Sequence, residues 1–137
     1  MILVSACLAG LHCRYDGGAK TNETVTRLVA EGKALPVCPE QAGGLTTPRL
    51  PCEIVNGRVM RKDGADVTAE FEKGARECLA LANLAGVKEA ILKSKSPSCG
   101  VDMIYDGSFS GRLVPGDGVF AAMCRKQGIN LLTEEDL

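Results

Sequence analysis

Short apolar runs alternate with amphipathic stretches along most of this chain. Four apolar runs have the length and composition of buried β-strands, and they cover residues 1–6, 34–37, 88–93 and 129–132. Three other stretches carry apolar residues three and four positions apart, as in helices that bury one face. These helical stretches cover residues 23–31, about 66–85 and 119–126.

This order of strands and helices predicts an α/β fold. Strands joined through intervening helices pair in parallel, with right-handed crossovers. No linker, repeat or low-complexity segment divides the chain. We therefore expect residues 1–137 to form a single three-layer, Rossmann-like α/β domain with a mostly parallel sheet of about four strands.

The segments between these elements carry turn signals. Residues 38–51 contain three prolines and two adjacent glycines, and we expect them to form a loop. Asn56-Gly57 is the strongest two-residue hairpin signal, so residues 54–60 should form a small β ribbon. Residues 103–109 are expected to add a short extended piece.

The charge balance excludes some classes of function. The chain has 16 basic and 17 acidic side chains and a formal net charge of −1, and no local run of Lys and Arg favours a nucleic acid partner. No apolar stretch approaches the roughly 20 residues that span a bilayer. The first ten residues lack the basic region of a secretion signal. A cytoplasmic protein without a nucleic acid or membrane partner is expected.

Cysteine is the residue type that points to chemistry. The chain has seven cysteines, an odd number, and cytoplasmic thiols stay reduced, so metal binding or catalysis is favoured over disulfides. Cys7, Cys38 and Cys99 each stand in the loop that follows a predicted strand. The carboxyl ends of parallel strands meet at one edge of a sheet. The sequence therefore predicts that these three thiols gather there to hold a metal or a cluster.

The other four cysteines lead to different predictions. Cys78 and Cys124 fall on the inward faces of predicted helices, where a free cysteine packs as a small apolar residue. Cys13 shares the first loop with Cys7 and is a less favoured alternative ligand. Cys52 follows a proline at the start of the predicted ribbon, and a surface role is expected there rather than ligation.

The spacing of the cysteines bears on the kind of metal. A structural zinc site wants four ligands, usually with a CxxC pair, and the chain has no such pair and a single histidine, His12. The close spacing of ferredoxin cysteines is also absent. Three widely separated thiolates suit a cubane iron–sulfur cluster in which one iron has no protein ligand and stays open to a substrate atom.

Three segments of the sequence carry a family likeness. They are VSACLAGLHCRYDG (4–17), CPEQAGGLTTPRLPCEI (38–54) and LKSKSPSCG (92–100). In this order they resemble a bacterial family, long of unknown function, that includes 2-thiouracil desulfurase. The resemblance spans nearly the whole chain, and the combination of the three segments is more specific than any one of them.

This resemblance implies a cofactor and a reaction. It implies a [4Fe–4S] cluster held by Cys7, Cys38 and Cys99, whose remaining iron takes the sulfur of a thiolated pyrimidine. It also matches Glu40 with a catalytic carboxylate and Ser96 with a catalytic hydroxyl. Cys52 departs from the family pattern, in which we expect a small residue.

The same loops supply the expected substrate contacts. The expected substrate-binding residues are Arg14, Asp16, Gly43, Gly44, Arg49 and Ser98. The charged members of this set could orient a planar heterocycle or pair with each other, and both readings stay open. A C=S sulfur is soft and suits iron of a cluster. Glu40 would then deprotonate a water that attacks the carbon, with no net redox change.

Two other classes of function remain open from the sequence. One is a regulatory module in which the cluster, or another metal, senses redox state without catalysis. The other is a thiol-based sulfur carrier that uses a cysteine of low pKa. The carboxylate and hydroxyl beside the expected ligands favour the desulfurase, because a sensor does not need them.

Overall fold

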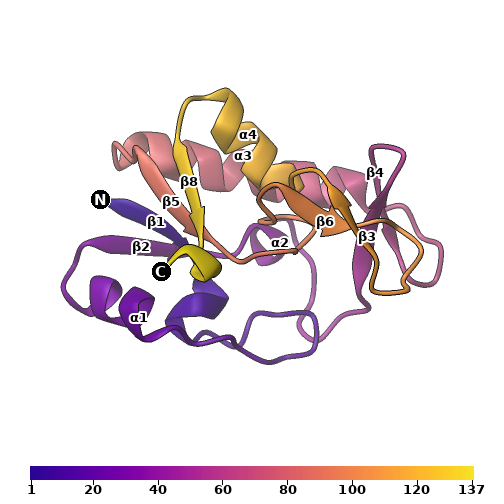
Figure 1. Ribbon diagram of the computed structural model, residues 1–137, viewed down its shortest axis with the longest axis horizontal. Coiled ribbons are helices and arrows are strands. Elements are labelled where there is room, and N and C mark those ends of the chain that lie inside the picture. The colour runs from indigo at the N-terminus through magenta and orange to yellow at the C-terminus, as the bar shows by residue number, and fades with distance from the viewer.

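The computed structural model describes residues 1–137, and its centre is a four-stranded parallel sheet (Figure 1). The strands, in their order across the sheet, are β2 (Ala34–Val37), β1 (Ile2–Ser5), β5 (Glu89–Leu92) and β8 (Asn130–Thr133). Each neighbouring pair is parallel. The predicted α/β fold with a mostly parallel sheet of four strands is therefore confirmed.

Helices cover both faces of this sheet, which gives the predicted three layers. In Figure 1, α1 (Glu23–Ala30) lies on one side of the sheet, and α3 (Thr68–Leu84) and α4 (Val119–Lys126) lie on the other. Successive strand residues point to opposite faces. Leu3 accordingly packs in a cluster with residues of α3 and α4, whereas Val4 packs in a second cluster with Val25 of α1.

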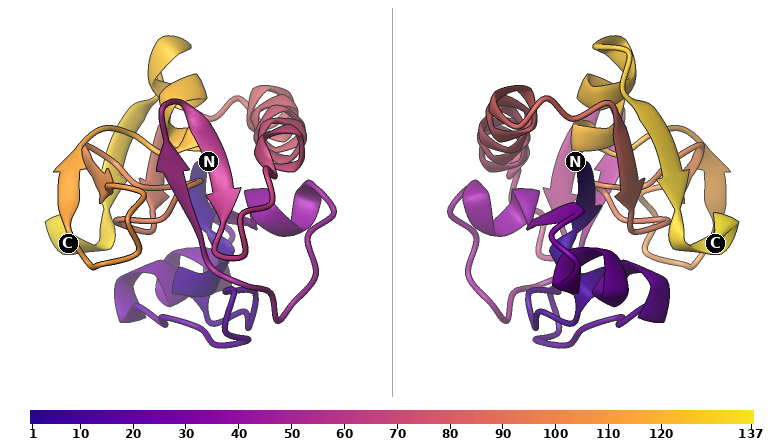
Figure 2. Two further views of the ribbon diagram at one scale, coloured as in Figure 1. Left: turned by 90° about the vertical axis from the view of Figure 1, so that its right-hand side faces the viewer. Right: turned by 90° about the vertical axis from the view of Figure 1, so that its left-hand side faces the viewer.

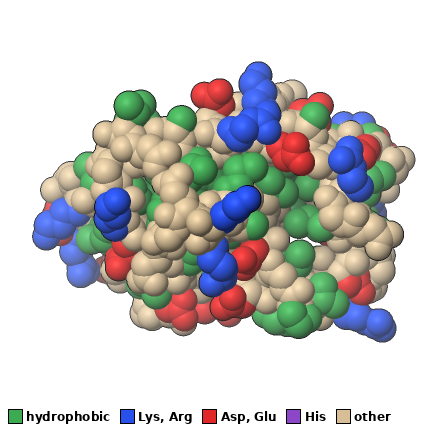
Figure 3. Space-filling view, turned by 90° about the horizontal axis from the view of Figure 1, so that it is seen from above, with side chains coloured by type: hydrophobic (Ala, Val, Ile, Leu, Met, Phe, Trp, Pro, Cys, Tyr) green, Lys and Arg blue, Asp and Glu red, His purple; other side chains and the backbone are tan.

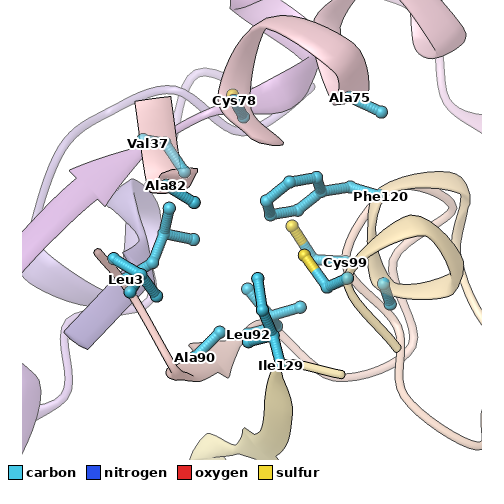
Figure 4. Close-up of a cluster of buried hydrophobic side chains, with 13 residues drawn as sticks. Leu3, Val37, Ala75, Cys78, Ala82, Ala90, Leu92, Cys99, Phe120 and Ile129 are labelled. Atoms are coloured by element: carbon cyan, nitrogen blue, oxygen red, sulfur yellow. The ribbon is translucent and has the colours of Figure 1, made fainter. Parts of the chain in front are cut away.

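The larger core cluster lies between the sheet and the α3–α4 layer (Figure 4). Phe120 is fully buried at its centre and is surrounded by small side chains of α3 and by apolar side chains of the strands. Cys78 and Cys124 belong to this cluster and are 4% and 0% exposed. The prediction that both cysteines are packing residues on helix faces is therefore confirmed.

The ends of the helices follow local sequence signals. The side chain of Asn22 accepts a hydrogen bond from the backbone N–H of Val25, which caps α1. Before α3, the carboxylate of Asp66 accepts one from the N–H of Thr68. The left-handed conformation of Gly32, with φ of 73°, follows α1.

The segment 38–51 differs from the expected loop, because it contains the short helix α2 (Pro39–Ala42). Pro39 stands at the first helical position, where a missing N–H costs nothing. A Cβ at Gly43 would overlap the carbonyl of Glu70 in α3, and one at Gly74 would overlap the carbonyl of Pro39. Two glycines therefore let α2 lie directly against α3.

Two antiparallel ribbons complete the fold. The predicted ribbon forms from β3 (Cys52–Val55) and β4 (Arg58–Arg61), joined by Asn56-Gly57. The second, β6 (Met103–Tyr105) with β7 (Leu113–Pro115), is foreseen from sequence only as an extended piece. Figures 1 and 2 show the two ribbons side by side at the end of the molecule opposite the N-terminus.

Two 3-10 turns lie beside strand ends. The turn η1 (Ala6–Ala9) follows β1 directly, and η2 (Glu134–Asp136) follows β8. In η2, the carboxylate of Glu134 accepts hydrogen bonds from the backbone N–H and the hydroxyl of Ser94 at 2.7 and 2.6 Å. This contact fixes the start of the loop after β5.

Charges of both signs are mixed over the face that Figure 3 shows, with apolar patches between them. This mixture agrees with the near balance of 16 basic and 17 acidic side chains. None of the helices combines the length and the apolar character needed to cross a bilayer.

Candidate active site at the carboxyl edge of the sheet

A cavity of about 390 Å³ lies between the carboxyl ends of the strands and the two ribbons. Its floor comes from the segments that follow β1, β2 and β5, and its outer wall from β3 and the β6–β7 ribbon. Pockets of this size suit small molecules. The cavity therefore occupies the edge at which a parallel α/β sheet is expected to bind its ligands.

Cys7, Cys38 and Cys99 all line this cavity, although they are far apart in the sequence. Cys7 lies in η1 directly after β1, Cys38 follows β2, and Cys99 lies in the loop after β5. Cys99 is also part of the main core cluster, beside Leu92 and Phe120 (Figure 4), so its thiol stands at the border between core and cavity. The structure thus brings together the three thiols that sequence reasoning singled out.

Two further cysteines line the same cavity. Cys13 is buried, and its thiol lies beside those of Cys7 and Cys38. The Cys38 thiol also donates to the carbonyl of Cys13, with 3.8 Å between the two atoms. Cys52 is half-buried in β3 rather than on the open surface, and its thiol lies 3.7 Å from the carbonyl of Leu50. The cavity wall is therefore richer in thiols than the three expected ligands.

The environment of Cys38, Cys52 and Cys99 favours the protonated form of their thiols. Burial raises the pKa of Cys99 to about 12. Burial, followed by the nearby carboxylate of Glu40, raises the pKa of Cys52 to about 11. The neighbouring Cys13 and then burial raise the pKa of Cys38. Thiols of this kind are poor nucleophiles in the free protein, and a bound metal would displace their protons.

Glu40 comes from the first turn of α2 and is held by Arg49. The guanidinium places Nε and Nη2 3.1 Å from Oε1 of Glu40. The same side chain donates to the carbonyls of Cys13 and Thr46 at 2.9 and 3.0 Å. Since its nitrogens are engaged within the protein, Arg49 pairs with Glu40 and orders two loops. This partner lies outside the set of charged residues that the sequence analysis considered.

The second oxygen of Glu40 contacts the loop after β5. The hydroxyl of Ser98 donates to Oε2 at 2.8 Å. Ser96 lies 3.2 Å from Ser98, oxygen to oxygen, and accepts from the backbone N–H of Cys99 at 2.7 Å. Because Ser98 gives its single proton to Glu40, the proton between the two serines comes from Ser96. The result is a chain of donors that runs from Ser96 through Ser98 to Glu40.

Arg14 also lines the cavity, and its Nε is a buried donor without a hydrogen-bond acceptor in the protein. The carboxylate of Asp16 is 3.7 Å from this atom, beyond hydrogen-bonding distance. The guanidinium carbon stands 5.6 Å from the centre of the Tyr15 ring. A buried donor that lacks a partner in a cavity is a natural contact for an acceptor atom of a ligand.

Three residues of the expected substrate-binding set do not line the cavity. Asp16 is exposed and accepts a hydrogen bond from the N–H of Gly18 within its own turn. Gly43 is buried against α3, and Gly44 is exposed behind it. The adjacent glycines serve the end of α2 and its packing on α3, a role that loop composition alone does not separate from ligand contact.

Sequence reasoning missed part of the cavity lining. The missed residues include Glu53, Lys93, Tyr105 and Phe109. Glu53 directly precedes the predicted ribbon and belongs to the observed β3, but nothing in the sequence says that the ribbon closes a cavity. The two aromatic residues stand out as members of a small group, since the chain has only three Phe and two Tyr. That scarcity is the signal that could have found them.

The donor set of the cavity fits a cluster better than a single ion. No three His, Cys, Asp or Glu side chains converge closely enough to hold one metal ion. In a cubane cluster the thiolates bind separate irons and stand apart, and thiolate is the ligand that iron–sulfur clusters prefer. Cys7, Cys38 and Cys99 line one cavity from three separate segments of the chain.

Comparisons with known proteins agree with this geometry. A solved structure described as a [4Fe-4S]-dependent thiouracil desulfidase, TudS, matches with a TM-score of 0.94 and 46% identity, over 99% of this chain and 91% of that chain. The uncharacterized protein YbbK of Bacillus subtilis (strain 168) is 42% identical over 100% of this chain and 97% of its own length. The 2-thiouracil desulfurase family model matches residues 2–136. The chain therefore belongs to the 2-thiouracil desulfurase family.

Proposed function

We propose that this protein is a [4Fe–4S]-dependent desulfurase that removes sulfur from a thiolated pyrimidine or a related thioamide heterocycle by hydrolysis. One observation carries the proposal. Three loops at one edge of the sheet bring thiols, a paired carboxylate and linked hydroxyls to a single cavity of about 390 Å³. The desulfidase named among the solved structures shares 46% of its sequence and nearly its whole fold with this chain.

Cys7, Cys38 and Cys99 would hold the cluster, and Cys13 would stand beside them without binding iron. A [4Fe–4S] cluster with three protein ligands supplies one open iron, which binds soft sulfur and withdraws electrons from the attached carbon. The three thiols come from separate loops that are fixed by β1, β2 and β5. Their positions are thus set by the sheet rather than by one flexible segment.

Glu40 would take a proton from the water that attacks the thiocarbonyl carbon. Arg49 holds one carboxylate oxygen and Ser98 the other, so the carboxylate has a fixed position at the cavity wall. The overall change replaces C=S and water with C=O and hydrogen sulfide. Atoms and charges balance without an electron donor, which agrees with a reaction without net redox change.

Arg14 and Ser96 would contact the heterocycle. The unpartnered Nε of Arg14 can donate to a carbonyl oxygen or a ring nitrogen of a pyrimidine. Ser96 stands at the other end of the hydroxyl chain from Glu40. Once Glu40 has taken a proton, the chain would reverse, so that Glu40 donates to Ser98, Ser98 to Ser96, and Ser96 to the substrate. A small planar heterocycle suits the volume of the cavity.

The arrangement favours catalysis over the two other classes of function. A sulfur carrier needs an activated thiolate, whereas burial raises the pKa of Cys99 to about 12 and that of Cys52 to about 11. A sensor needs the thiols but gains nothing from the ordered Glu40, Ser98 and Ser96. The carboxylate and its hydroxyl partners are therefore the feature that separates an enzyme from a sensor.

The test compares three protein samples under anaerobic conditions. The first is the apoprotein, the second is protein loaded with iron and sulfide, and the third is a loaded Glu40→Gln variant. We expect conversion of 2-thiouracil to uracil by the loaded protein alone, and a loss of about 10²–10⁴-fold in the variant at equal iron content. Turnover by the apoprotein, or none by the loaded protein, would contradict the proposal.

A further inference from the structure

The β6–β7 ribbon closes the cavity through the loop 106–111. Tyr105 and Phe109 line the cavity on this side. The loop lies directly on β3, because a Cβ at Gly107 would collide with the side chain of Val55 and the carbonyl of Ile54. Glycine at position 107, with φ of 95°, is therefore a requirement of the close approach.

Glu53 of β3 holds this loop in place through hydrogen bonds to its backbone. One oxygen of its carboxylate, Oε1, accepts hydrogen bonds from the backbone N–H of Gly107 at 3.0 Å and of Phe109 at 3.1 Å. Hydrogen bonds between a carboxylate and backbone N–H groups are among the stronger ones in proteins. The side chain of Glu53 thus sets the position of Phe109, although more than fifty residues of sequence separate the two.

Phe109 is held in a backbone conformation that bulky residues avoid. Its φ is +56°, in the left-handed region that favours glycine. Two residues of the same loop with positive φ, Gly107 and Gly111, are glycines. Strain of this kind persists where the surrounding structure enforces it, and it clusters at functional sites.

Packing of the hydrophobic core does not explain the position of the Phe109 ring. Phe71 and Phe120 are buried to 1% and 0% exposure and belong to core clusters. Phe109 is half-exposed and belongs to no core cluster, but it lines the cavity. The ring of Phe109 therefore lies at the cavity wall, outside the core, on a strained backbone. A ring in this position is expected to contact a ligand.

We propose that Phe109 is the specificity-determining residue of this site and packs on the flat face of the heterocycle, with Glu53 as its positioning residue. The inference rests on the proposed function and names a substrate class, planar rings rather than open-chain thioamides. Ring stacking on aromatic side chains tolerates different bases, because every base has a π-face. The cavity would therefore accept several thiolated pyrimidines with similar affinity.

Phe109→Gly is the decisive variant, because it removes the ring and relieves the backbone. We expect KM for 2-thiouracil to rise about 5- to 100-fold, with kcat and cluster absorbance close to those of wild type. The affinity for uracil, measured by titration calorimetry, should fall by a similar factor. The melting temperature should not fall, since glycine adopts a positive φ without strain.

Asn56→Gly is the matched control. Asn56 also has a positive φ, of 50°, but it stands in the β3–β4 turn and does not line the cavity. This variant should keep the KM of wild type.

Glu53→Ala should raise KM. Glu53→Gln keeps an acceptor oxygen, so it should raise KM by a smaller factor. A purely structural Glu53 would change the melting temperature and leave KM unchanged.

Each outcome decides the proposal. Unchanged KM and unchanged uracil affinity in Phe109→Gly would overturn it, and so would a Phe109→Gly protein that fails to fold, because the ring would then be a packing residue. If loaded wild-type protein does not convert 2-thiouracil, the proposed function fails. The uracil titration still compares wild type with Phe109→Gly in that case, so the two failures are distinguishable.

Discussion

The hydroxyl of Ser98 donates a 2.8 Å hydrogen bond to Oε2 of Glu40, although 58 positions separate the two residues in the chain. Glu40 comes from α2 after the second strand of the chain, and Ser98 from the loop after β5. The contact links two loops that also carry Cys38 and Cys99. The carboxylate is therefore positioned by the same segments as the expected ligands.

Ser98→Ala tests how much the hydrogen bond between Ser98 and Glu40 contributes to the reaction. The variant leaves one oxygen of a largely buried carboxylate without its donor, and a hydrogen bond to a charged group contributes about 1.5–3 kcal/mol. We expect kcat/KM for 2-thiouracil to fall about 10- to 100-fold at unchanged iron content. Steady-state kinetics and the cluster absorbance measure the two quantities. A Ser98→Ala enzyme with wild-type kcat/KM would show that the contact does not serve the reaction.

Arg49 should matter chiefly for stability. Its side chain is 7% exposed and that of Glu40 is 14% exposed, so Arg49→Met would leave a buried carboxylate without its cation. Removing one partner of such a pair costs about 3–5 kcal/mol. Arg49→Lys should lose less, because it keeps the charge but not the planar fork. Urea unfolding of the apoprotein measures the difference.

The Arg58–Asp66 pair is the control for Arg49. Its atoms are 2.9 Å apart, but its side chains are 59% and 40% exposed. Exposed pairs contribute little to stability, so Arg58→Met should shift the urea midpoint only slightly. Equal shifts in Arg49→Met and Arg58→Met would contradict the role given to Arg49.

The cysteines divide into ligands and packing residues in a way that iron analysis can check. Ser substitutions of Cys7, Cys38 or Cys99 should lose iron after anaerobic reconstitution, because each removes one of three protein ligands. Cys13→Ser should keep it. Cys78→Ala should keep full iron content and lower stability by about 1 kcal/mol through a small cavity. Iron loss in a folded Cys13→Ser protein would move Cys13 into the ligand set.

Much of the fold could be predicted from the sequence, because its signals are local. The apolar runs give the four strands, and the cap at Asn22 and the glycine at position 32 frame α1. The helix α4 (Val119–Lys126) begins and ends where its periodicity predicts. Local signals fail for α2, which is four residues long, and for β7, which is three. Elements so short depend on contacts that the sequence does not display.

The candidate site also has features that could be predicted from the sequence and features that could not. The rule that loops after parallel strands meet at one edge was enough to bring Cys7, Cys38 and Cys99 together. It could not say that Arg49 pairs with Glu40, because that contact depends on side-chain geometry between two loops. The contact of Glu53 with the amide of Phe109 is likewise a tertiary event. Such contacts require the structure.

Hydrolysis without redox chemistry is the central claim, and isotope labelling tests it most directly. Cluster-loaded protein is incubated with 2-thiouracil in water enriched in ¹⁸O, without any reductant, and uracil is analysed by mass spectrometry while sulfide is assayed in parallel. The account predicts one ¹⁸O atom in each uracil and one sulfide released for each turnover. Product without the label, or turnover that depends on an added electron donor, would contradict it.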